Sequence, residues 1–210
     1  MTKSDLTRWL VTFGISLAFT GVAQPAQAMR FSLLGDLDLA SAKVVSSASP
    51  TVKSKAGFGG GAALELELTP WCGVEVGGFY VKRKMELTSS TTVDIFSSTT
   101  IQIPAILRLW AGGIFTVGGG LYYSLGSGNL SVNGAYKNYS DYGISSNEFG
   151  YLGVVGFNFR WKPWLSVAVE GRYMGGIYDV SLAPADSWKY SDKQVLLGLR
   201  LNTGGSGAGG

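Results

Sequence analysis

Apolar and polar residues alternate along most of the chain after residue 28. Because successive side chains of a β-strand point to opposite faces, this period of two predicts strands with one apolar and one polar face. Eight segments follow the pattern: Phe31–Leu39, Gly57–Leu68, Cys72–Met85, Thr100–Trp110, Phe115–Leu125, Phe149–Trp161, Leu165–Tyr173 and Gln194–Asn202. The same region has no helical hydrophobic stretch long enough to cross a bilayer.

The connections between these segments alternate between short and long. Tight turns are expected at Thr69-Pro70, at Ala111-Gly112-Gly113 and at Lys162-Pro163, whereas the other connections are longer and rich in Ser, Thr, Asn and Tyr. Short periplasmic turns and longer extracellular loops are typical of outer-membrane barrels. We therefore predict an all-β fold over residues 29–203: a transmembrane antiparallel up-and-down β-barrel of about eight strands, with both termini in the periplasm.

A soluble up-and-down barrel of the lipocalin kind would also show alternating strands. Its outward face should be rich in Lys and Glu, whereas the polar face here is largely Gly, Ser and Asn with a few charges. Only 15% of the residues are charged, below the quarter usual for soluble domains. The tryptophans near the expected turns also suit an aromatic girdle at a membrane interface: Trp71, Trp110, Trp161 and Trp164. These features favour the membrane barrel.

The first 28 residues have the layout of a bacterial secretory signal peptide. Lys3 and Arg8 make a positive start, residues 9–23 are apolar, and Ala26-Gln27-Ala28 forms an A-x-A cleavage site. A retained membrane anchor is the alternative, but the apolar run is shorter than a spanning helix requires. We expect Sec-type export to the bacterial outer membrane. The glycine-rich residues 204–210 are expected to be a flexible tail.

The charge and the residue types present limit the chemistry that is expected. A net charge of +3 on scattered Lys and Arg does not indicate a nucleic-acid partner. The chain has no histidine, so neither a Ser-His-Asp triad nor a His-Asp dyad can form. A Ser-Lys pair is formally possible, but nothing singles one out. With no histidine and one cysteine, a metal site is not expected either. We predict a protein that is not an enzyme and uses no cofactor.

The polar faces of the strands carry charges of both signs, and these are predicted to face the barrel lumen. The predicted lumen charge network consists of Asp36, Asp38, Glu65, Glu67, Glu75, Arg108, Arg160, Glu170, Arg172 and Arg200. An eight-stranded barrel is just narrow enough for side chains to fill, and arginine can bind carboxylates bidentately. One interpretation is a structural plug. The other is a narrow conduit or small-ligand site, for which the many inward glycines would leave room.

The connection between the fifth and sixth segments offers a second candidate site. Tyr136, Lys137, Tyr139 and Tyr142 cluster there with Asn138. Tyrosine among small polar residues suits a recognition surface, and an ordinary solvated loop is the alternative. Two functions follow: a non-enzymatic barrel with a structural or surface-interaction role through its extracellular loops, or a narrow channel or small-molecule transporter that uses the lumen. The sequence does not indicate which extracellular partner the loops would contact.

Several stretches resemble a known family. Residues 99–108, with an Ile103-Pro104 pair leading into an alternating strand, resemble the PorT-like outer-membrane β-barrel domain family. Residues 118–124 and 149–153 are similar to its later strands, and nearly all of the segment after residue 28 resembles small eight-stranded surface barrels. The resemblance implies outer-membrane lipid and the barrel-assembly machinery as partners. One departure is that the last strand ends near Leu201 and Asn202, without the terminal aromatic residue of many such proteins.

Overall fold

The computed structural model describes residues 28–45, 51–88, 93–127, 130–142, 145–178, 180–181 and 187–203. Two of the expected segments, the signal peptide and the glycine-rich tail, therefore lie outside the described residues, apart from Ala28. Among the residues that the structure describes, no helix is long and apolar enough to cross a membrane.

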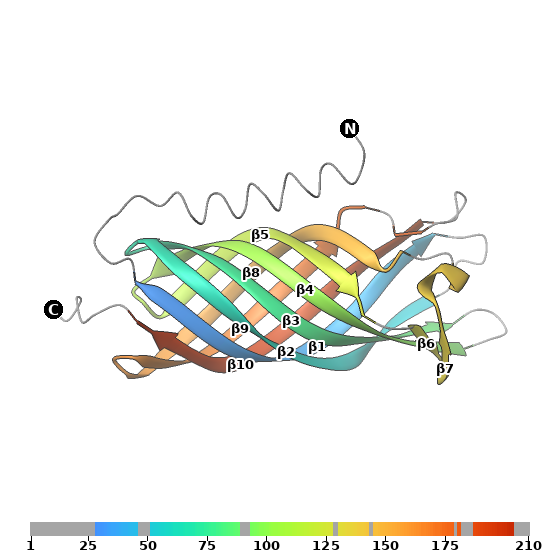
Figure 1. Ribbon diagram of the computed structural model, residues 1–210, viewed down its shortest axis with the longest axis horizontal. Helices are drawn as coiled ribbons and strands as arrows, with labels where there is room; N and C mark the ends of the chain where they lie inside the picture. The colour runs from blue at the N-terminus through green and yellow to red at the C-terminus, as the bar shows by residue number, and fades with distance from the viewer. Residues whose placement is uncertain are drawn as a thin grey trace.

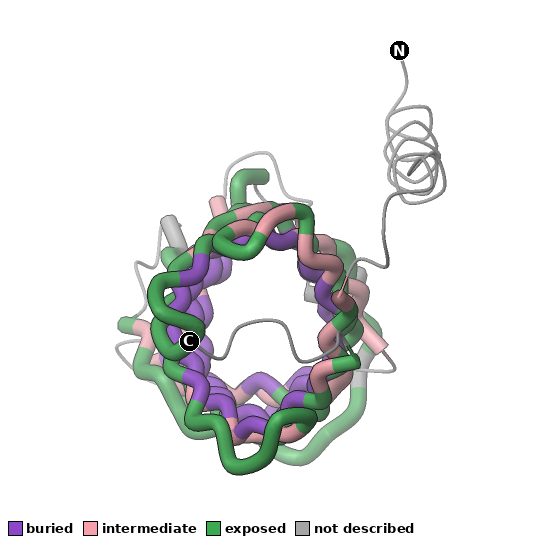
Figure 2. The backbone as a smooth tube through the Cα atoms, turned by 90° about the vertical axis from the view of Figure 1, so that its left-hand side faces the viewer, coloured by how far each residue is buried: buried purple, intermediate pink, exposed green. Residues whose placement is uncertain are grey.

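Eight long antiparallel strands form a closed ring (Figures 1 and 2). They are β1 (Met29–Val45), β2 (Thr51–Thr69), β3 (Cys72–Thr88), β4 (Val93–Ala111), β5 (Phe115–Gly126), β8 (Asn147–Lys162), β9 (Leu165–Gly176) and β10 (Ser187–Asn202). Each strand pairs with its neighbours in the ring, and the pairing of β1 with β10 closes it. The all-β up-and-down barrel predicted from the sequence is confirmed.

A short hairpin extends the wall beyond the ring. It consists of β6 (Leu130–Val132) and β7 (Ala135–Lys137), it pairs with β4 through Phe96 and Ser97, and the 3₁₀ helix η1 (Tyr139–Tyr142) follows it. Asn133 and Gly134 join the two strands with φ of 50° and 85°. Positive φ at both central residues is the requirement of a type I′ turn, for which Asn-Gly is the preferred sequence.

The two ends of the barrel differ. At one end, which we call the turn end, lie the tight connections at residues 70–71, 112–114 and 163–164. The ring also begins and finishes there, since the Thr203 amide donates to the Met29 carbonyl at 2.9 Å. The opposite end, the loop end, holds the longer connections and the β6–β7 hairpin (Figure 1).

Around most of the barrel the apolar face of each strand points outward. On β1, for example, Leu33 and Leu37 are exposed whereas Asp36 and Asp38 between and beyond them are buried. Figure 2 shows this alternation of buried and exposed backbone around the ring. An apolar exterior around a polar interior is the arrangement of a barrel in lipid, where every backbone group is paired within the closed sheet.

The two faces exchange character toward the loop end. On β3 the outward residues change from the apolar Val76 and Tyr80 to Lys82 and Lys84. The inward residues change from the charged Glu75 to the apolar Met85 and Leu87. The inward apolar residues of this end form one buried cluster, the loop-end apolar cluster: Ala42, Met85, Leu87, Phe96, Val132, Val180 and Tyr190. On β3 this exchange marks the limit of the apolar band, above which the strand has the face pattern of a soluble sheet, whereas on β4 Val93 and Ile95 remain exposed.

Several strands extend further toward the loop end than the sequence pattern predicted. β10 begins at Ser187 rather than at Gln194, and β4 begins at Val93 rather than at Thr100. On β10 the exchange of faces explains the difference, because a segment whose apolar residues turn inward does not continue the alternation of the segment below it. On β4 the polar residues 97–99 interrupt the apolar alternation, although Val93 and Ile95 beyond them still face outward. These extensions carry polar residues that matter for the lumen.

Candidate functional site: the lumen

The centre of the lumen is filled by five charged side chains. We call Glu75, Arg108, Glu170, Arg172 and Arg200 the central ion-pair cluster. They come from β3, β4, β9 and β10, because the inward register of each strand places one or two of them at the same level. Arg108 lies 2.8 Å from Glu75 and 2.9 Å from Glu170, and all five side chains are almost completely buried.

The contacts of this cluster bridge the lumen rather than run along one wall. β3 and β9 lie on opposite sides of the ring, yet Arg172 Nη2 on β9 is 3.0 Å from Glu75 Oε1 on β3. Arg200 on β10 reaches Glu170 at 2.8 Å and also bonds Ser32 and Asn158. Ion pairs between opposed strands therefore cross the lumen at this level.

A second polar layer lies nearer the loop end. We call Arg83, Gln102, Tyr122, Glu148, Asp192 and Gln194 the loop-side polar cluster. Arg83 Nη1 donates to Glu148 at 2.8 Å and its other nitrogen Nη2 donates to Asp192. Gln194 of β10 donates to Gln102 of the opposed strand β4 at 2.9 Å. This layer also connects opposite sides of the lumen.

The turn end carries a third set of contacts. Glu65 accepts a hydrogen bond from Arg30 at 3.0 Å and one from the Trp110 indole at 2.6 Å, and Arg30 also pairs with Glu67. The Arg30 guanidinium lies 4.2 Å from the centre of the Trp110 ring, a cation–π contact. Trp110 is thus buried on the inward face of β4, so the expectation that it belongs to an outward aromatic girdle is wrong, whereas Trp71, Trp161 and Trp164 are exposed. A cavity of about 40 Å³ opens at the turn end, large enough to hold water.

The structure distributes the ten predicted lumen residues over these levels. Glu75, Arg108, Glu170, Arg172 and Arg200 lie together in the central cluster. Glu65 and Glu67 lie at the turn end, and Arg160 is exposed at the rim there, where it lines the small cavity. Asp36 and Asp38 are buried on the inward face of β1, and none of their carboxylate oxygens has a hydrogen-bond partner among the described residues.

Sequence reasoning missed the loop-side polar cluster as a site. Arg83 lies on the same face of β3 as Glu75, so the register alone could have added it to the network. Glu148 and Asp192 lie in strand extensions outside the segments that the alternation predicts. Arg30 lies at the start of β1, one residue before the predicted strand.

The inward glycines do not leave the lumen open, contrary to the expectation from their number. A Cβ at Gly150 would lie 2.4 Å from the Tyr122 ring, and one at Gly156 would lie 3.0 Å from the Glu170 side chain. At Gly73 the nearest atom is the Glu65 carboxylate, at 2.7 Å. At these three glycines a large polar side chain therefore occupies the space in front of the glycine, so the missing Cβ accommodates that side chain rather than a solute.

The loop tyrosines are not all presented alike. Tyr136 on β7 is 77% exposed, whereas Tyr139 on η1 is partly buried against the loop-end apolar cluster. Burial raises the pKa of the Tyr139 phenol. The side chains of Lys137 and Tyr142 lie outside the described residues, so the structure does not show whether the four residues form one surface.

Comparison with known proteins gives the fold. No family model matches the chain. No curated protein matches it. Among solved structures it is similar to the outer membrane protein OprG from Pseudomonas aeruginosa, with 13% identity over 87% of this chain and 99% of that one, and a TM-score of 0.56.

A second similar structure is Neisserial surface protein A (NspA). It is 17% identical to this chain, the match covers 81% of this chain and 96% of that one, and the TM-score is 0.50. At these identities the likeness concerns the fold. The chain thus has the fold of small eight-stranded outer-membrane β-barrels.

Proposed function

We propose that the protein is a sealed, non-enzymatic barrel of the bacterial outer membrane that anchors a surface structure at its loop end. The observation that carries this proposal is the set of polar contacts that cross the lumen. Two polar layers bridge opposed strands, and the loop-end apolar cluster covers them on one side. A structural or surface-interaction role through the loop end fits this arrangement better than transport through the lumen.

The location follows from several observations together. The outward apolar band suits lipid, the first 28 residues suit Sec-type export, and the similar solved structures are outer-membrane proteins. The turn end would face the periplasm with both termini, and the loop end would face outside. Insertion would require the barrel-assembly machinery. Membership of the PorT-like family stays a prediction from the sequence.

The decisive experiment is planar-bilayer conductance of the refolded protein. Heat-modifiable gel migration first verifies that the barrel has folded, and conductance is then recorded for the wild type, Arg108→Ala and Glu75→Ala. We expect a silent wild type. Discrete wild-type conductance that either substitution changes would refute the sealed barrel and favour the alternative, a narrow channel or small-molecule transporter.

A further inference from the structure

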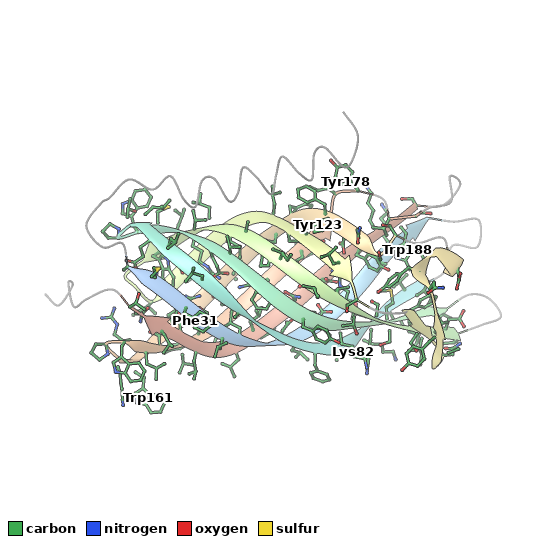
Figure 3. The ribbon with its side chains drawn as sticks, in the orientation of Figure 1. Phe31, Lys82, Tyr123, Trp161, Tyr178 and Trp188 are labelled. Carbon is green, nitrogen blue, oxygen red and sulfur yellow. The ribbon has the colours of Figure 1, made fainter. Side chains whose placement is uncertain are left out.

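Lysines gather on one side of the barrel, just beyond the apolar band. We define the lysine face as the outward-facing lysines of four neighbouring strands, β10, β1, β2 and β3: Lys43, Lys53, Lys55, Lys82, Lys84, Lys189 and Lys193. On β3 and β10, Lys82 and Lys193 follow directly after the exposed Tyr80 and Val195 in the direction of the loop end. On β1 and β2, Lys43 and Lys55 lie within four residues of the exposed Leu39 and Phe58. Figure 3 shows Lys82 on the outer side of the wall.

The lysine face covers only half of the circumference. At the corresponding level the other four strands carry uncharged residues, such as Thr99 on β4, Asn147 on β8 and Gly175 on β9. A general solubilising rim would be distributed around the whole barrel. The one-sided distribution indicates a surface for a particular occupant.

Lysines of this face also lie directly opposite one another. Lys43 of β1 pairs in register with Lys189 of β10, and Lys55 of β2 pairs with Lys84 of β3. Like charges directly opposite on one face of a sheet are destabilising. An anion bound between them would remove the repulsion.

The described residues supply little negative charge to this face. Glu86 lies 2.8 Å from Lys55 and 3.8 Å from Lys53. The other five lysines form no ion pair with any residue that the structure describes, and Lys43, Lys82, Lys189 and Lys193 are exposed. The lysine face therefore carries an excess of positive charge at the proposed membrane boundary.

We propose that the lysine face binds the phosphate groups of anionic lipid headgroups in the leaflet at the loop end. This inference rests on the proposed membrane location. The lysines lie where the apolar exterior ends, which is the level of the headgroups, and an ammonium group binds phosphate as a compact point charge. A phosphorylated glycolipid, which carries several phosphates, matches a face with seven lysines on four neighbouring strands.

The test measures lipid binding by the refolded protein in a neutral detergent, with native mass spectrometry as the readout. The probes are diphosphoryl lipid A, phosphatidylcholine and inorganic phosphate. The variants are the double substitutions Lys43→Gln/Lys189→Gln and Lys82→Gln/Lys84→Gln. Lys43→Arg/Lys189→Arg keeps the charge, and Lys162→Gln removes an outward lysine at the turn end.

We expect lipid A to bind the wild type and phosphatidylcholine to bind far more weakly. Each double glutamine variant should lose on the order of tenfold or more in lipid A affinity, since one lysine near an anionic surface is worth roughly fivefold. The arginine variant and Lys162→Gln should bind as the wild type does. Raising the salt concentration should weaken binding, because exposed charges are screened.

Equal lipid A binding by the wild type and both glutamine variants would overturn the inference. Inorganic phosphate that competes at the same concentration as lipid A would also overturn it, in favour of a site for the free ion. Heat-modifiable migration separates the two proposals. A wild type that folds as a barrel but binds no lipid A refutes only this inference, whereas one without heat-modifiable migration refutes the proposed function as well.

Discussion

Glu170 contacts all three arginines of the central ion-pair cluster. Its carboxylate lies 2.9 Å from Arg108, 3.0 Å from Arg172 and 2.8 Å from Arg200. Glu170→Gln keeps the size of the side chain but leaves three guanidinium groups around Glu75 alone. Because removal of one partner leaves buried charges uncompensated, we expect the free energy of unfolding to fall by about 3–5 kcal/mol.

Arg108→Met provides the matched control. Arg108 contacts both carboxylates of the cluster, those of Glu75 and Glu170. Without Arg108 the cluster holds two arginines and two glutamates, so its charges balance. We expect a loss of about 1–2 kcal/mol, mainly from the missing hydrogen bonds. The comparison therefore separates charge balance from packing, since both substitutions remove one buried charged group from the same level of the lumen.

The assay is urea unfolding from neutral lipid vesicles, followed by tryptophan fluorescence. With a dependence of about 2 kcal/mol per molar urea, Glu170→Gln should lower the midpoint by about 2 M and Arg108→Met by less than about 1 M. Equal midpoints for the two variants, or a more stable Glu170→Gln, would refute the argument that charge balance within the cluster governs its stability.

Three further outcomes are expected. Gly150→Ala should lower the free energy of unfolding by about 1–3 kcal/mol because its Cβ would meet the Gly175 carbonyl oxygen and the Tyr122 ring, whereas Gly153→Ala on the same strand has open space and should be neutral; equal effects would contradict this. Asp38→Asn should preserve or raise stability in the same assay, since the buried carboxylate has no hydrogen-bond partner among the described residues, and a large loss would show a missing partner. Val132→Ser should speed proteolysis of the β6–β7 hairpin without altering heat-modifiable migration, because Val132 is buried in the loop-end apolar cluster; unchanged proteolysis would show that this contact does not hold the hairpin.

The sequence predicted the barrel well where one solvent surrounds it. In the apolar band, exposed residues such as Leu33 and Leu37 recur at alternate positions of their strand. This period predicted the number of strands and the inward face of each. Five inward residues predicted in this way meet in the central ion-pair cluster. Their pairing across the lumen depends on how the closed ring staggers its strands, which alternation alone does not define.

Prediction failed where the surroundings of the strands change. In residues 187–193 the apolar Trp188 and Tyr190 lie on the inward face of β10, the same face on which Gln194 and Arg200 lie nearer the turn end. The segment therefore did not continue the alternation of the predicted strand. Asp192 lies in this segment and was therefore not predicted to face the lumen. The Asn133-Gly134 pair, by contrast, is a local hairpin signal, and attention to it would have located the β6–β7 turn.

The exchange of faces along continuous strands has a mechanical consequence. β3 runs on from Lys82 to Thr88 with its backbone still bonded to β2 and β4, a rise of about 20 Å along the strand. The portion beyond the apolar band is therefore a stiff collar built from the same sheet, rather than a set of tethered loops. A ligand held at the rim of this collar would keep a fixed height and orientation above the apolar band, and a force applied there would be transmitted as tilt of the whole barrel.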